Sequence, residues 1–241
     1  MLRESRFSYA CNACGLCCHD KVITLSPYDV LRMARAQGLS TSEVVDRFTI
    51  RRGSILRFDK MGRCSFLEGN RCSTHSGRPL ACRLYPLGLE RDGEQERFIT
   101  LEPARGSLGV FGTRGTIDEF LETQSVEPYF AGNDRYRELL PLFRERINAL
   151  IDFEVIEPRE FWRCATREAL AESNFDPNRI IDLLFGADRF AIDCSIDEAT
   201  QNHLDSLKEQ IACERDPAIL AAAALLLAVS LGYSPSEVIG G

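Results

Sequence analysis

Apolar positions recur at helical spacing in the stretch that follows residue 26. Ser26 and Pro27 are typical of an N-cap and a first helical position, and Gly38 suits a helix C-terminus. The pattern predicts a helix with a buried stripe made of Val30, Leu31, Ala34 and Leu39. A second short helix is predicted over residues 41–48.

Residues 50–102 lose the helical spacing and mix short apolar runs with Gly and Asn. This pattern predicts short strands and tight loops. A hairpin is predicted with arms at 84–90 and 96–101, because the pair Asp92-Gly93 between them is typical of a hairpin turn.

The helical pattern returns at Thr116, where a capping residue is followed by acidic residues in the first turn. Helices are predicted over 116–124, 134–155, 158–173, 177–185, 195–214 and 217–231. We therefore expect a mainly α fold with a small irregular α+β region that is rich in cysteine. The expected domains are a cysteine-cluster domain over 1–102 and a helical domain over 103–241.

The run from Ala218 to Leu231 is almost wholly apolar but is shorter than the roughly 20 residues that span a bilayer. A helix that is apolar all round needs cover on every side. We therefore expect no membrane span, and we expect the C-terminal helices to bind a protein partner or a second copy of the chain.

Ten cysteines in 241 residues change this ordinary picture. The N-terminus shows no apolar stretch of the kind found in signal peptides. We therefore expect a cytoplasmic, reducing location, where dense cysteine indicates metal or redox chemistry rather than disulfides.

Basic residues gather in the same half as the cysteines. Residues 1–100 contain 16 Lys and Arg against 11 Asp and Glu, while the whole chain has a net charge of −7. Metal-bound thiolates retain negative charge that arginines can offset. Because no nucleic-acid-binding motif accompanies the charge, we do not expect nucleic-acid binding.

Seven cysteines in two groups are the predicted metal ligands: Cys11, Cys14, Cys17, Cys18, Cys64, Cys72 and Cys82. The first group has the spacing C-x2-C-x2-C-C, and its first three members could wrap one side of a metal centre. Bacterial ferredoxins begin a cluster-binding run with the same spacing, which favours a [4Fe–4S] cluster completed by one remote cysteine. Any four of the seven would also satisfy zinc.

Seven sulfurs exceed the four that one zinc ion or one cluster needs. Neighbouring side chains normally diverge, so we do not expect Cys17 and Cys18 to bind one ion together. Two sites, one multinuclear site with shared sulfurs, or redox-active bystanders all remain open. His19 and His75 are further candidate ligands. The other cysteines, Cys164, Cys194 and Cys213, are expected to be buried small apolar residues.

The two cysteine groups resemble the YkgJ-type cysteine-cluster family of zinc- or iron-chelating proteins. The first group reads CNACGLCC, and the second ends in R-P-L-A-C-R-L-Y-P over residues 78–86. This resemblance covers residues 10–90 and extends to the cysteine region of flagellin lysine-N-methylases. The aromatic residue that the family carries before Arg-Pro is replaced here by the stretch 73–76.

Arg78 and Arg83 flank Cys82, and we expect them to donate to thiolate sulfur or to balance its charge. The favoured function is an iron–sulfur or zinc protein that serves in electron transfer or assists an oxidoreductase. A structural zinc module that binds a partner, and a methyltransferase-like enzyme, are the alternatives. The run Gly106 to Gly112 lacks the context of a nucleotide-binding fingerprint and is expected to be a loop.

Overall fold

The structure is a computed structural model that describes residues 1–50, 53–92, 95–151, 157, 160–165, 183–188 and 194–233. It is mainly helical with small strand pairs, as expected. The described helices are α1 (Pro27–Gln37), α2 (Thr41–Phe48), α3 (Leu80–Leu84), α4 (Ile117–Gln124), α5 (Glu127–Arg137), α6 (Leu139–Leu150), α9 (Ile196–Cys213) and α10 (Pro217–Ser230), with short 3-10 helices η1 (Leu16–Cys18) and η2 (His75–Gly77).

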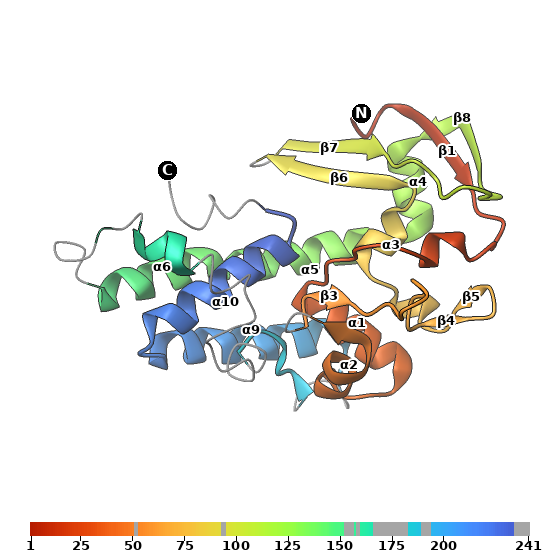
Figure 1. Cartoon of the computed structure of the whole chain (residues 1–241). Coiled ribbons are helices and arrows are strands. Elements are labelled where there is room, and N and C mark those ends of the chain that lie inside the picture. Colours follow the sequence, from red (N-terminus) through yellow and green to blue (C-terminus); the bar gives the residue numbers. More distant parts are fainter. Residues whose placement is uncertain are drawn as a thin grey trace.

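The strands form four antiparallel pairs in the described part of the chain. They are β1 (Arg6–Ala10) with β8 (Val110–Thr116), β2 (Thr49–Ile50) with β3 (Ile55–Leu56), β4 (Leu67–Glu68) with β5 (Arg71–Cys72), and β6 (Leu87–Asp92) with β7 (Gln95–Thr100). In Figure 1, β1, β8 and the β6–β7 hairpin lie above α5, while α1, α2 and α9 lie below it.

The two N-terminal helices form where the sequence predicts them. In each, a serine N-cap and an acidic residue at the third helical position complete a reciprocal capping box: Ser26 with Asp29 in α1, and Ser40 with Glu43 in α2. Gly38 ends α1 in the left-handed conformation. Of the predicted stripe, three residues are buried and Leu39 is partly buried.

The two arms of the predicted hairpin pair as β6 and β7, and Gly93 of its predicted turn lies outside the described residues. The first arm starts later than predicted. Leu84 belongs to α3, because the backbone of residues 82 and 83 bonds back to Pro79. The run from Gly106 to Gly112 is a loop only up to Gly109, since its last residues pair with β1.

In the helical half, two boundaries differ from the prediction. Helix α5 begins at Glu127, ahead of the predicted start at residue 134. The helix predicted over 134–155 is also divided after Arg137, because Pro141 has no N–H for the carbonyl four residues earlier and its ring crowds that carbonyl. Most of the segments predicted over 158–173 and 177–185 lie outside the described residues.

Helix α10 is covered within the chain itself. Eleven of its residues are buried, and it packs most closely against α6. Among the described residues, no helix combines the length and apolarity that crossing a bilayer requires. A role for the C-terminal helices in binding a partner or a second copy stays a prediction.

One hydrophobic core joins residues from both sides of the predicted boundary at 102/103. Leu25 and Phe66 belong to the same core as Phe143 and Leu220. A second core places Phe98 with Ile117. Packing is therefore continuous across the boundary, and the division into two domains stays a prediction.

Asp29 links the start of α1 to the start of α3. One of its carboxylate oxygens accepts hydrogen bonds from the backbone N–H and the hydroxyl of Ser26, both at 2.9 Å. The other accepts from the backbone N–H of Leu80 at 2.8 Å. The side chain is fully buried, and desolvation raises its pKa. Because α3 carries Cys82, this carboxylate positions one of the predicted ligands.

The variant Asp29→Asn should unfold more easily than the parent chain. The amide turns a donor toward groups that are themselves donors, which should cost about 2 kcal/mol of unfolding free energy in urea. Glu43→Gln is the matched control, because Glu43 has the same capping role but lies on an exposed face. A loss in Asp29→Asn no greater than in Glu43→Gln would contradict the linking role.

Acid should weaken the contact between α5 and α9. His203 is buried and its Nδ1 lies 2.7 Å from the Tyr136 hydroxyl, and burial lowers the pKa of His203 to about 4. An unfolded chain protonates this ring near pH 6.5. The contribution of neutral His203 to the free energy of unfolding is therefore fully present above pH 6.5. It should fall by about 3 kcal/mol as the pH drops toward 4. Urea unfolding across this range should show a shallower slope in His203→Gln; an unchanged slope would contradict the assignment.

Candidate metal centre

The fold brings the end of the first cysteine group against the second group. The backbone N–H of Cys64 donates to the carbonyl of Cys18 at 2.9 Å, and His19 forms a β-bridge with Arg63. Gly15 allows the turn into η1, because its backbone there is left-handed. A Cβ at this position would also lie 3.3 Å from the Asn70 Cα.

Cys17 and Cys18 do not diverge. Their Sγ atoms lie 3.9 Å apart, because the tight turn of η1 places both on one side of the backbone. The expectation that adjacent cysteines point away from each other is therefore wrong here. The Cys18 thiol donates to Cys17, which lowers the pKa of Cys17 to about 6 and raises that of Cys18.

The three cysteines of the second group are largely removed from water. Cys64 is buried, and Cys72 and Cys82 are partly covered. Desolvation raises the pKa of each thiol, most strongly for Cys82. The negative charge of Cys17 acts on all three and raises their pKa further, so these sulfurs and the Cys17–Cys18 pair share one electrostatic environment. We call these five residues the inner thiols.

Cys11 and Cys14 are the remaining cysteines of the first group. Cys11 is exposed, as Cys17 is, and Cys14 is partly covered. Hydrogen bonds from the backbone of Leu108 and Leu16, and from the Ser107 side chain, lower the pKa of Cys14. Residues 107–108 belong to the loop before β8, which the Asn12 side chain also holds by donating to the Leu108 carbonyl at 2.6 Å.

The two predicted arginines differ in what they touch. The guanidinium of Arg78 interacts electrostatically with Cys72 and Cys82. Its hydrogen bonds, however, are to His75 and Gln124. Arg83 is 8% exposed and donates to three backbone carbonyls: those of Ser76, Arg78 and Gln124. Arg83 therefore fastens the loop before α3 to the end of α4, and donation to sulfur stays a prediction for both.

The candidate histidine ligands are both engaged by protein groups. Nε2 of His75 lies 2.8 Å from a guanidinium nitrogen of Arg78 and accepts from it. Nδ1 of His19 lies 3.2 Å from the Gly15 carbonyl, which leaves Nε2 without a hydrogen bond in the described residues. Of the two rings, His19 has the freer nitrogen for a metal.

The three remaining cysteines are less buried than expected. Cys213 is the last residue of α9 and is exposed, while Cys164 and Cys194 are partly exposed. The assumption that an isolated cysteine lies in the core fails for Cys213, because the end of α9 reaches the surface.

The sulfur donors of the inner thiols suit a soft metal, and the distance between the Cys17 and Cys18 sulfurs suits a zinc ion. A tetrahedral zinc site with Zn–S bonds of about 2.3 Å separates neighbouring sulfurs by about 3.8 Å, close to the Cys17–Cys18 spacing. Within the described ranges, no three His, Cys, Asp or Glu side chains already stand in a complete metal-binding arrangement. A metal at the pair must therefore draw in further sulfurs from the second group.

Several residues that contact the cysteine region were not predicted from the sequence. Asp29 was visible only as a helix-start residue, although the pattern Ser26-x-x-Asp29 does announce a capping box. Ser107 and Gln124 lie beyond residue 102, and nothing in their local sequence indicates contact with the cysteine region.

Comparison with known proteins agrees with the cysteine pattern. No curated protein and no solved structure matches the chain. Residues 10–103 match the family model CxxCxxCC, which is described as a "Putative zinc- or iron-chelating domain". The matched range contains all seven predicted ligands and Asp29, so this part of the chain is similar to metal-chelating domains, with zinc and iron both compatible.

Proposed function

We propose that the chain is a zinc-binding protein whose N-terminal region holds one ion through the inner thiols. The observation that carries the proposal is the 3.9 Å separation of the Cys17 and Cys18 sulfurs, which is close to one edge of a tetrathiolate site. In an iron–sulfur cubane each cysteine binds a different iron, so two ligating sulfurs need not approach so closely.

The remaining two ligands would come from Cys64, Cys72 and Cys82. Their segments differ: Cys64 follows directly on a bridge to the first group, Cys72 ends β5, and Cys82 lies in α3. An ion held by sulfurs from these segments would tie them together, so its binding energy would contribute to folding. The chemistry that zinc supplies in such a closed site is structural.

Charge near the thiols supports the loading of a metal. Four thiolates around a divalent ion leave a net charge of −2, and the guanidinium of Arg78 lies within the field of Cys72 and Cys82. The thiols with raised pKa values are protonated at neutral pH, so zinc must displace protons from them.

An iron–sulfur cluster that serves electron transfer is the second candidate function. It is favoured by Cys14, whose sulfur accepts hydrogen bonds from two backbone N–H groups and the Ser107 side chain, as sulfurs in clusters do. This candidate uses Cys11, Cys14 and Cys17 with one cysteine of the second group, and thus a different set of ligands.

Elemental analysis with an absorption spectrum, on the full chain purified without oxygen or chelator, separates the two candidates. We expect about one zinc per chain, no acid-labile sulfide and no visible absorption band. Brown protein that contains iron and sulfide would contradict the zinc proposal and support the cluster. Protein that contains neither metal, even after both are supplied, would contradict both.

Two substitutions locate the ion. Cys18→Ser should weaken zinc binding by at least about tenfold, because loss of a partner outside the ligand shell already costs that much. Cys14→Ser should leave zinc binding unchanged, whereas the cluster candidate predicts the reverse order. Cys213→Ser is the control, because Cys213 is exposed at the end of α9.

A further inference from the structure

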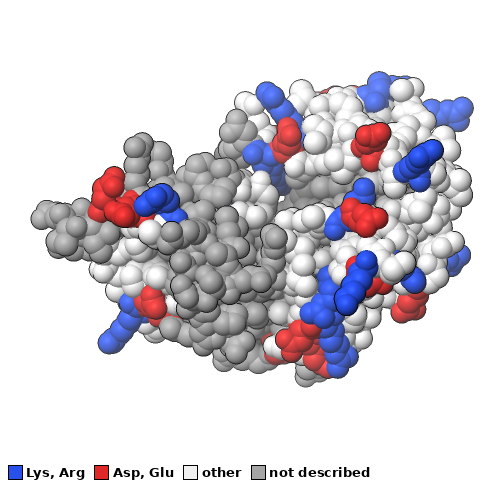
Figure 2. Space-filling view, in the orientation of Figure 1, with Lys and Arg blue, Asp and Glu red and all other residues white. Residues whose placement is uncertain are grey.

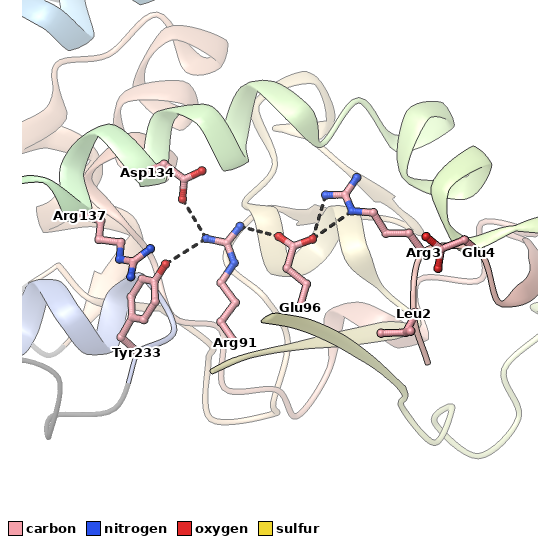
Figure 3. Close-up of a pocket in the computed structure, with 8 residues that line it drawn as sticks. All are labelled: Leu2, Arg3, Glu4, Arg91, Glu96, Asp134, Arg137 and Tyr233. Carbon is pink, nitrogen blue, oxygen red and sulfur yellow. Dashed lines mark hydrogen bonds and ion pairs between the residues drawn. The ribbon is translucent and has the colours of Figure 1, made fainter. Parts of the chain in front are cut away.

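A second polar site lies where the N-terminal segment, the β6–β7 hairpin and α5 meet. Here a pocket of about 400 Å³, within the range of small-molecule sites, is lined by Leu2, Arg3, Glu4, Arg91, Glu96, Asp134, Arg137 and Tyr233. Figure 3 shows these side chains, with Arg137 and Tyr233 at one end and Glu4 at the other. None of the predicted metal ligands lines it.

Two of the lining arginines are already engaged in ion pairs. Arg3 contacts Glu96 at 2.9 Å and also pairs with Asp118 and Glu127. Arg91 contacts Glu96 at 2.9 Å and Asp134 at 3.1 Å, and its side chain is only 9% exposed. These pairs hold the hairpin and the N-terminal segment against α5, so the walls of the pocket are fixed before a ligand arrives.

Other polar groups in the pocket can still form hydrogen bonds or ion pairs with a ligand. Arg137 lies over the Tyr233 ring at 4.8 Å and has no hydrogen bond or ion pair with any described residue. The Tyr233 hydroxyl accepts from Arg91 at 3.3 Å, which leaves its own proton free to donate. Asp134 uses one oxygen for Arg91, and its side chain is 56% exposed.

The balance of charge restricts the ligand. The lining contains three arginines and three carboxylates, and the carboxylates are those of Glu4, Glu96 and Asp134. Figure 2 likewise shows blue and red side chains next to one another on the face in view. A balanced lining does not favour a simple anion over a simple cation. The free guanidinium and phenol proton need an acceptor, and the free oxygen of Asp134 needs a donor. The ligand must therefore bring both signs of charge.

We propose that this pocket binds a small zwitterion of the α-amino acid class. Its carboxylate accepts from Arg137 and the Tyr233 hydroxyl, and its ammonium donates to the free oxygen of Asp134. Asp134 and Arg137 are three residues apart on α5 and hence neighbours on one face, which suits two charged groups separated by a single carbon. The side chain of the ligand lies toward Leu2 and Glu4.

Saturation-transfer NMR on the full chain, with alanine, leucine, lysine and glutamate each at about 10 mM, tests the proposal in the range of millimolar dissociation constants. We expect leucine or lysine to bind, and glutamate to bind more weakly because it adds negative charge. Propionate and ethylamine, which each carry one of the two charges, should bind at least about tenfold more weakly than the best amino acid.

Substitutions then assign the contacts. Arg137→Gln should weaken binding at least about tenfold, and Tyr233→Phe, which removes only the hydroxyl, by a smaller factor. Arg135→Gln is the control: it lies on the same helix, bonds to Gln201 and does not line the pocket. Circular dichroism checks that each variant is folded. The proposal is overturned if no amino acid binds, or if folded Arg137→Gln and Tyr233→Phe both bind as the parent does.

Discussion

The buried carboxylate of Asp29 is the contact on which the cysteine region depends. It closes the N-terminus of α1 and receives the first N–H of α3, so two segments separated by some fifty residues share one polar anchor. An unpaired charge at this depth would be costly, and the three groups that donate to it offset that cost. Gly77 completes the arrangement, because any side chain there would collide with the backbone of α1 at Arg32.

From this anchor, contacts extend into both halves of the chain. Arg83, which follows Cys82, donates to the end of α4 and lies over the ring of Tyr129 in α5 at 4.6 Å. The helical half thus forms part of the support for the thiols. The pocket beside Arg91 is lined by Asp134 and Arg137 in the last turn of the same helix α5, so one helix supports both the candidate metal centre and the candidate zwitterion site.

Local signals in the sequence predicted local structure well. Serine caps, Gly38 and the spacing of apolar residues located α1 and α2, and the turn pair Asp92-Gly93 located the hairpin. Contacts between distant segments were not predictable in this way. Strand β8 pairs with β1 across about a hundred residues, and Ser107 reaches Cys14 from a loop with no distinguishing pattern. The Cys17–Cys18 contact was missed because the tight turn of η1 overrides the usual divergence of neighbours.

The central claim is that Cys17 and Cys18 form one edge of a mononuclear thiolate site completed by the second cysteine group. X-ray absorption at the zinc edge of the protein purified with its metal measures the ligand shell directly. The account predicts a single shell of four sulfurs at about 2.3 Å. A shell dominated by nitrogen or oxygen at about 2.0 Å would contradict it.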